Sequence, residues 1–299
     1  MLYAKTPAHE KRRLFRERLA TGELLCFPGA FNPLSAKLIE RKGFDGVYIS
    51  GAVLSADLGL PDIGLTTLTE VAQRAGQIAR VTDLPSIVDA DTGFGEAMNV
   101  ARTVQTLEDA GLAGCHIEDQ VNPKRCGHLD GKEVVGTSTA VQRIRSAADA
   151  RRDDNFLIMA RTDIRALEGL DAAIDRSKAL VDAGADAIFG EAMRDLSEFE
   201  QLAAALDVPV LANMTEFGKS ELFTVDQLRD VGVRMVIWPV STLRMAMGAT
   251  ERALDTLLSE GNLTSQLGAM QHRADLYDLL DYEEYNSFDS SIFNFQITK

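Results

Sequence analysis

Two aspartates separated by one residue, Asp89 and Asp91, follow a short apolar run and are well suited to hold a hard cation. If that run is a β-strand, the alternation of its side chains directs both carboxylates to one side. Mg²⁺ prefers such oxygen ligands and takes one or two carboxylates, with water and substrate oxygens completing its shell. The pair therefore predicts a Mg²⁺ site, which Mn²⁺ could also fill.

A second apolar run ends in the same pattern, with His116 and Glu118 on one side of the expected strand. Glu118 could therefore reach a water on the metal, and we include it in the predicted metal site. A zinc site is disfavoured, because the sequence has no HExxH motif, no CxxC pair and only four histidines.

The loop after this run places one thiol among basic side chains. Cys126 is preceded by Lys124 and Arg125 and followed by Gly127 and His128. Cationic neighbours lower a thiol pKa from its usual value of about 8.5, which makes proton exchange near neutral pH feasible. A long loop after a strand is typical of an active-site lid. We therefore predict that Cys126 exchanges protons near neutral pH, with Lys124 and His128 as candidate catalytic neighbours.

Arg161, Arg244 and Arg273 are candidates to bind substrate carboxylates, because guanidinium binds a carboxylate through two parallel hydrogen bonds. Arg161 is the strongest of them, since it ends an apolar run where an unpaired charge would be costly. The chain needs such local cations, because its net charge is −14. That charge argues against binding to nucleic acid or to an anionic membrane and leaves a small anionic molecule as the expected partner.

These residues are positioned by a regular alternation of strand and helix patterns. Apolar runs typical of buried strands cover 24–28, 46–50, 86–91, 114–118, 156–161, 187–191, 208–213 and 235–239. Helical patterns cover 32–42, 68–81, 97–110, 139–150, 170–183, 196–205, 225–231 and 241–260. Eight repeats predict an α/β fold, a closed (β/α)₈ TIM-type barrel, with an open doubly wound sheet as the alternative. No G-x-G-x-x-G motif follows the first strand to favour that alternative.

A barrel would collect the polar residues at its strand ends on one face, where barrel enzymes place their chemistry. Those residues are Ser50, Asp89, Asp91, His116, Glu118, Arg161, Glu191, Asn213 and Ser241. We expect residues 1–299 to form one barrel domain with an N-terminal helix and a C-terminal helical tail.

The three cysteines are too few for a disulfide framework, and no apolar run approaches the roughly 20 residues of a membrane span, so we expect a cytoplasmic protein.

The motifs together resemble the isocitrate lyase and phosphoenolpyruvate mutase superfamily, and within it the 2-methylisocitrate lyases. The matching segments are 48–51, 59–62, 88–95, 116–120, 124–128, 159–163, 211–218 and 270–277. The resemblance implies that Asp89 and Asp91 hold Mg²⁺, with Asp62 and Glu118 behind them, and that Cys126 is the catalytic acid. It implies that substrate is bound by Ser50, Gly51, Ala52, Cys126, Gly127, Arg161, Glu191, Asn213, Thr215, Arg244 and Arg273.

The implied reaction is a retro-aldol-type cleavage of 2-methylisocitrate to pyruvate and succinate, a step of propionate breakdown by the methylcitrate cycle. Cleavage of isocitrate is an alternative, as is hydrolase or mutase chemistry on oxaloacetate or phosphonates. The general base stays open among Asp62, Tyr48 and a metal-bound hydroxide. The chain departs from the family pattern at Ala52, where some relatives have glycine, and at Gly190, where proline is usual. The resemblance also implies a homotetramer in which the last helix packs on a neighbouring subunit.

Overall fold

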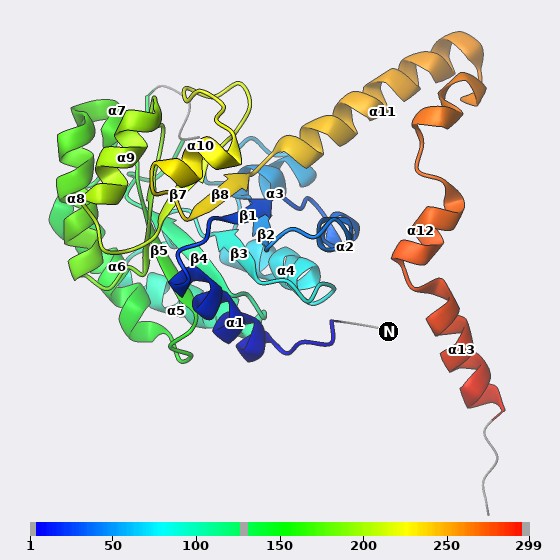
Figure 1. The fold of residues 1–299 in the computed structure, drawn as a ribbon, viewed down its shortest axis with the longest axis horizontal. Helices are drawn as coiled ribbons and strands as arrows, with labels where there is room; N and C mark the ends of the chain where they lie inside the picture. The colour runs from blue at the N-terminus through cyan, green and yellow to red at the C-terminus, as the bar shows by residue number, and fades with distance from the viewer. Residues whose placement is uncertain (1–3, 126–130, 295–299) are drawn as a thin grey trace, which may run out of the picture.

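The computed structural model describes residues 4–125 and 131–294, and its centre is an eight-stranded parallel sheet curled into a barrel (Figure 1). The strands are β1 (Leu25–Pro28), β2 (Val47–Ile49), β3 (Ser86–Asp89), β4 (Gly114–Glu118), β5 (Leu157–Thr162), β6 (Ala187–Gly190), β7 (Val210–Asn213) and β8 (Met235–Trp238). They pair in the order β1-β8-β7-β6-β5-β4-β3-β2, and a bridge between Gly29 and Tyr48 brings the two ends together. The predicted (β/α)₈ architecture is confirmed, and the open-sheet alternative is wrong.

Helices follow the strands and cover the outside of the barrel (Figure 1). The eight expected ones are α2 (Pro33–Arg41), α4 (Leu68–Ala79), α5 (Ala97–Asp109), α6 (Thr137–Ala150), α8 (Leu170–Asp182), α9 (Leu196–Ala204), α10 (Val225–Asp230) and α11 (Ser241–Glu260). Two further helices, α3 (Gly51–Asp57) and α7 (Arg165–Glu168), were not expected. Both are too short to repeat an apolar face, so the period-based prediction missed them.

Strand alternation divides the core into two layers. Residues such as Phe27, Met159 and Phe189 point inward and form one buried cluster, whereas their neighbours in sequence pack outward against the helices. Helix α1 (Ala8–Ala20) adds Phe15 and Leu19 to the inner cluster. Its Arg12 also hydrogen-bonds the backbone oxygen of Leu112, just before β4. Helix α1 therefore covers the N-terminal end of the barrel, and the strand-end polar residues occupy the opposite face.

The C-terminal part of the chain forms an arm that projects from the barrel (Figure 1). It comprises α11, a 3₁₀ helix (Thr264–Ala269), α12 (Arg273–Leu279) and α13 (Tyr282–Phe293). Ion pairs join it to α2, from Arg41 to Asp278 at 2.6 Å and from Lys37 to Asp281 at 3.2 Å. Across residues 4–125 and 131–294, we find no helix with the length and apolar character of a membrane span.

Candidate active site

Asp89 and Asp91 lie side by side at the end of β3, although only Asp89 belongs to the strand. The predicted alternation is wrong for Asp91, because the chain turns there into the left-handed region at φ +46°. Its backbone N–H donates to Asp89 Oδ1 at 3.0 Å, which supports the turn. A Cβ at Gly51 would lie 2.9 Å from Asp89 Oδ2 and 3.3 Å from Asp91 Oδ1. The absence of a side chain at position 51 thus leaves room for both carboxylates.

Lys124 extends from the loop after β4 into this pair of carboxylates and is 2% exposed. Its Nζ lies 2.8 Å from Asp91 Oδ1 and also contacts Asp62. Burial lowers the pKa of Lys124, but the surrounding carboxylates, Asp89 foremost, outweigh burial and raise it above its usual value. Burial, together with the charge of Asp89, raises the pKa of Asp91 to about 6. The lysine thus offsets part of a dense negative charge.

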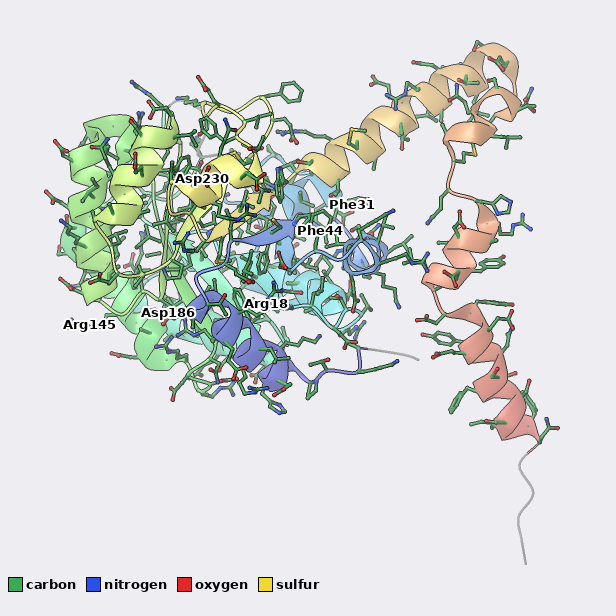
Figure 2. The ribbon with its side chains drawn as sticks, in the orientation of Figure 1. Arg18, Phe31, Phe44, Arg145, Asp186 and Asp230 are labelled. Atoms are coloured by element: carbon green, nitrogen blue, oxygen red, sulfur yellow. The ribbon has the colours of Figure 1, made fainter. Side chains whose placement is uncertain are left out.

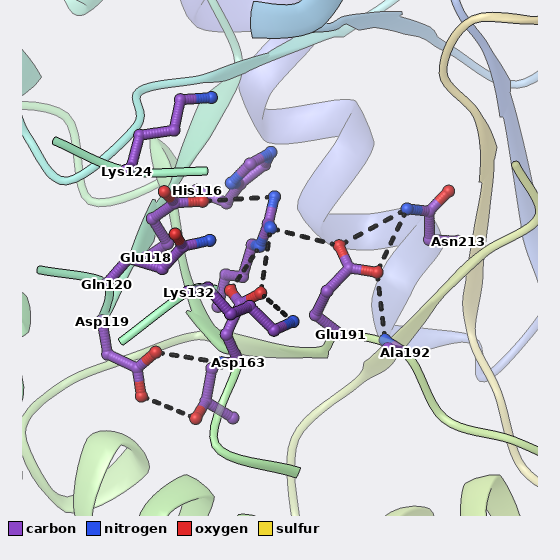
Figure 3. A network of polar contacts seen from close by, with 12 residues as sticks. His116, Glu118, Asp119, Gln120, Lys124, Lys132, Asp163, Glu191, Ala192 and Asn213 are labelled. Carbon is purple, nitrogen blue, oxygen red and sulfur yellow. Dashed lines mark hydrogen bonds and ion pairs between the residues drawn. The ribbon is translucent and has the colours of Figure 1, made fainter. Parts of the chain in front are cut away.

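Arg161 contacts three carboxylates, those of Glu118, Asp163 and Glu191, which Figure 3 labels. Asp163 accepts hydrogen bonds from its Nε at 3.0 Å and its Nη2 at 3.3 Å. Glu118 lies 3.2 Å from Nη1, and Glu191 lies 3.4 Å from Nη2. The guanidinium also stands 5.2 Å from the centre of the Phe189 ring. Every nitrogen of Arg161 is therefore engaged by the protein.

Glu118 is buried, and neither of its carboxylate oxygens hydrogen-bonds a described residue. Burial raises its pKa well above the usual range, although the nearby charges of Arg161 and Lys124 partly offset that effect. Asp89, Asp91 and Glu118 together offer only oxygen donors, which fits Mg²⁺. In the described part of the chain, no group of three or more acidic, histidine or cysteine side chains forms a ready-made metal cage. Mg²⁺ does not require one, because it keeps several water ligands.

Tyr48 and His116 form a buried pair beside Asp89. The Tyr48 hydroxyl lies 2.8 Å from His116 Nε2, and the two rings are stacked. Burial lowers the pKa of His116 to about 4 and raises that of Tyr48 well above its usual value. At neutral pH the imidazole is uncharged and the phenol keeps its proton. Tyr48 is therefore better suited to donate a proton than to act as the general base.

The structure brings most of the other predicted residues to the same face. Ser50 is buried at the start of α3, and Ala52 is half-buried in its first turn. The amide of Asn213 lies 3.5 Å from the carboxylate of Glu191 (Figure 3). Thr215, two residues further on, is buried as well.

Of the three candidate arginines, Arg244 and Arg273 lie outside the centre of the site, and they differ in placement. Arg244 Nη1 reaches Thr215 Oγ1 at 3.2 Å, at the rim of the site. Arg273 stands apart from the site within one chain, exposed at the start of α12 in the arm. The predicted residues Cys126, Gly127 and His128 lie outside the described residues.

A buried support for Arg161 was missed by the sequence reasoning. Asp163 has no exposed surface, and its carboxylate pairs with Lys132 at 2.7 Å as well as with Arg161. Asp119 accepts hydrogen bonds from the hydroxyl of Thr162 at 2.7 Å and the backbone N–H of Asp163 at 2.9 Å. Alternation from Arg161 could have found Asp163, because two residues further along a strand return to the same side.

Comparison with known proteins gives a consistent result. The family model described as phosphoenolpyruvate phosphomutase matches residues 15–258. A probable 2-methylisocitrate lyase of Corynebacterium glutamicum is 60% identical over 96% of this chain and 93% of its own length. The 2-methylisocitrate lyase of Aeropyrum pernix is 45% identical over 96% of this chain and 93% of its own.

Solved structures agree with the sequence relatives. Oxaloacetate acetylhydrolase bound to 3,3-difluorooxalacetate has a TM-score of 0.91 and 33% identity, over 98% of this chain and all of that one. Phosphonopyruvate hydrolase in complex with oxalate and Mg²⁺ has a TM-score of 0.85 and 28% identity, over 94% of this chain and 98% of that one. By sequence and by structure, this chain belongs to the phosphoenolpyruvate mutase and isocitrate lyase superfamily.

Proposed function

We propose that this protein is a Mg²⁺-dependent carbon–carbon lyase that cleaves 2-methylisocitrate to pyruvate and succinate. The observation that carries the proposal is the presence of three buried carboxylates, Asp89, Asp91 and Glu118, at the ends of β3 and β4 in a chain 60% identical to a probable 2-methylisocitrate lyase. The test is to incubate the purified enzyme with 2-methylisocitrate and Mg²⁺ and to measure pyruvate and succinate. Failure to release both products in equal amounts refutes the proposal.

Asp89 and Asp91 are the residues we propose to hold the metal, with Glu118 and Asp62 able to bind its water ligands. Mn²⁺ can replace Mg²⁺ at such an oxygen site. A bound divalent cation supplies Lewis-acid stabilisation of negative charge on the substrate's oxygens. The side chains of Asp89 and Asp91 are already largely shielded from solvent, since each residue is 5% exposed.

The reaction needs a base, a proton donor and groups that hold carboxylates. Cleavage begins when a base removes the hydroxyl proton, after which the carbon–carbon bond breaks and leaves a carbonyl product and a carbanion beside a carboxylate. Asp62, next to Lys124, is our candidate base, because Tyr48 keeps its proton at neutral pH. Cys126 would protonate the carbanion to give succinate, with His128 of the same loop as a cationic neighbour. The ammonium of Lys124, predicted as a second such neighbour, instead contacts Asp91 and Asp62.

Other members of this superfamily offer rival reactions, and the likeness to oxaloacetate acetylhydrolase makes hydrolysis of oxaloacetate the first of them. Isocitrate cleavage and phosphonate chemistry are the others. The thiol-containing sequence 124–128 favours a lyase, because the hydrolase and mutase reactions need no proton from a lid thiol. Assays of isocitrate, oxaloacetate and phosphonopyruvate beside 2-methylisocitrate separate these possibilities.

We also propose that the arm packs against a neighbouring subunit in a homotetramer. An apolar groove of about 640 Å³ separates α2 from the start of α11 and is lined by Phe31, Phe44 and Met245, among others. Figure 2 labels the two phenylalanines on the side of the barrel that faces the arm. The arm exposes Phe288 and Phe293, and an apolar surface of this kind is typical of an interface. Light scattering on the purified protein measures the oligomeric state.

A further inference from the structure

Arg244 differs from Arg161 in the way the protein holds it. All three hydrogen bonds of its guanidinium leave from Nη1, to Thr215 Oγ1 at 3.2 Å, to the backbone oxygen of Glu216 at 2.8 Å and to the Glu216 carboxylate at 3.0 Å. Its Nε and Nη2 donate no hydrogen bond to the residues that the structure describes. The edge formed by Nε and Nη2 is one of the two that bind a carboxylate through parallel hydrogen bonds.

Glu216 is itself fixed in place. The hydroxyl of Ser241, the first residue of α11, donates to its carboxylate. Arg244 belongs to the first turn of the same helix, where the positive end of the helix dipole disfavours a cation. A carboxylate at this position therefore offsets an unfavourable placement of the guanidinium. Burial raises the pKa of Glu216, but the bonds from Ser241 and Arg244 outweigh burial and keep it below its usual range.

Phe217 completes the support. Its ring centre lies 5.4 Å from the Arg244 guanidinium, so the side chain covers one face of the cation. The residue is 94% exposed, and its backbone adopts φ +60°, which is unfavourable for an aromatic residue. Neither feature benefits packing in the barrel. Both are consistent with a loop shaped around the arginine.

Arg244 stands at the rim of the proposed site, where its Nη1 contacts Thr215. Thr215, which contacts Arg244, is buried two residues beyond Asn213, and the amide of Asn213 lies 3.5 Å from Glu191. We propose that Glu216 is a positioning residue that, with Thr215 and Phe217, holds Arg244 so that its Nε–Nη2 edge receives one carboxylate of the substrate. This inference rests on the proposed function, because the carboxylate belongs to the substrate of that reaction.

The test compares steady-state kinetics of wild type, Glu216→Gln, Arg244→Lys and the double variant with 2-methylisocitrate and saturating Mg²⁺. Glu216→Gln removes the negative charge from the half-exposed ion pair of Glu216 with Arg244. It is expected to raise KM about 3- to 5-fold with little change in kcat. Arg244→Lys is expected to raise KM at least about 10-fold, because lysine cannot form the two-bonded fork. In the Arg244→Lys background, Glu216→Gln is expected to change KM by less than about 2-fold, because this variant has no guanidinium group for Glu216 to orient.

The matched control is Asp226→Asn, which removes the same charge from the exposed ion pair of Asp226 with Arg229 on α10 and is expected to leave KM unchanged. A lower KM for Glu216→Gln would make Glu216 a competitor of the substrate and overturn the proposal. An unchanged KM, or an equal effect in both backgrounds, would overturn it as well. If the wild type does not cleave 2-methylisocitrate, the proposed function fails, and the same four proteins then test the positioning role on whichever carboxylate substrate is turned over.

Discussion

The ammonium group of Lys124 lies 2.8 Å from Asp91 Oδ1, so a positive charge already stands among the carboxylates proposed to bind Mg²⁺. The two residues come from different loops, after β4 and after β3. In the absence of metal, the positive charge of Lys124 offsets part of the repulsion between Asp89 and Asp91. Lys124 and the proposed Mg²⁺ would therefore stabilise the same group of carboxylates.

Lys124→Ala is expected to destabilise the metal-free protein more than the Mg²⁺-loaded protein. Removing one partner of a buried ion pair costs about 3–5 kcal/mol, because the other charge is left unpaired. Mg²⁺ can replace part of the lost positive charge. Thermal unfolding of wild type and variant in EDTA and in saturating Mg²⁺ measures the difference, and an equal loss of Tm under both conditions would contradict it.

Activity is expected to require Mg²⁺ or Mn²⁺ and to disappear in Asp89→Ala. The carboxylate of Asp89 is one of the two proposed to hold the metal, and its loss removes an oxygen ligand from a buried site. Asp91→Ala is expected to behave in the same way. The assay is pyruvate release with and without excess EDTA, with circular dichroism to verify that the variants fold. Full activity in EDTA would rule out the metal site.

The stabilising effect of Mg²⁺ is expected to grow as pH rises through about 6. The pKa of Asp91 is raised from its usual 3.8 to about 6 in the folded protein. Between these values the folded protein keeps a proton that the unfolded chain releases, so this group's contribution to stability is present at low pH and is lost as pH rises through 6. Mg²⁺ binds the ionised carboxylate and offsets that loss.

The measurement for this pH effect is Tm from pH 4.5 to 7.5, with and without Mg²⁺, in wild type and Asp91→Asn. The metal-free wild type is expected to lose more Tm over this range than the variant, which has no carboxyl group to titrate at this position. Parallel curves for the two proteins would show that Asp91 does not titrate in this range.

Cys126→Ser is expected to bind substrate but to lose most turnover, because a hydroxyl is a much weaker acid than a thiol. The other two cysteines serve as controls. Burial raises the pKa of Cys26 to about 11 and that of the buried Cys115 higher still, so neither provides thiolate near neutral pH. Cys26→Ser and Cys115→Ala are expected to retain kcat. A Cys126→Ser enzyme with the wild-type rate would assign proton donation to another residue.

The enzyme is expected to prefer 2-methylisocitrate to isocitrate by roughly 10- to 200-fold in kcat/KM, because an apolar pocket gains about 1–3 kcal/mol from one methyl group. Buried Phe189, Ile237 and Pro239 stand at the ends of β6 and β8, where such a pocket is expected. Equal or faster cleavage of isocitrate would reverse the preference and leave the lyase mechanism intact.

The barrel could be predicted closely because its signals are local. The apolar run 114–118 coincides with β4, and the helical pattern 241–260 coincides with α11. Each depends on periodicity within one segment, and eight such segments permit few architectures. The convergence of strand-end side chains then followed from the geometry of a parallel barrel.

The contacts within the site could be predicted less well, because they depend on turns and on residues distant in sequence. Aspartate adopts the left-handed region more readily than most residues, but its type alone does not require the turn at Asp91. The burial of Lys124 among acidic side chains depends on the path of a loop. Arg273 was placed by its residue type and by the family resemblance, whereas its location depends on an arm that leaves the barrel. The orientation of Arg244 likewise depends on its contact with the backbone oxygen of Glu216, in the loop after β7.

Helix α1 has a consequence for the order of product release. Phe15 and Leu19 are 1% and 7% exposed and fill the interior beneath the inward-facing strand residues. Neither product can therefore leave through the N-terminal end of the barrel, and both must pass the opening by which the substrate entered. A two-product reaction with one opening is expected to release its fragments in sequence, the outer one first, and the fragment that leaves last is then a competitive inhibitor of the substrate.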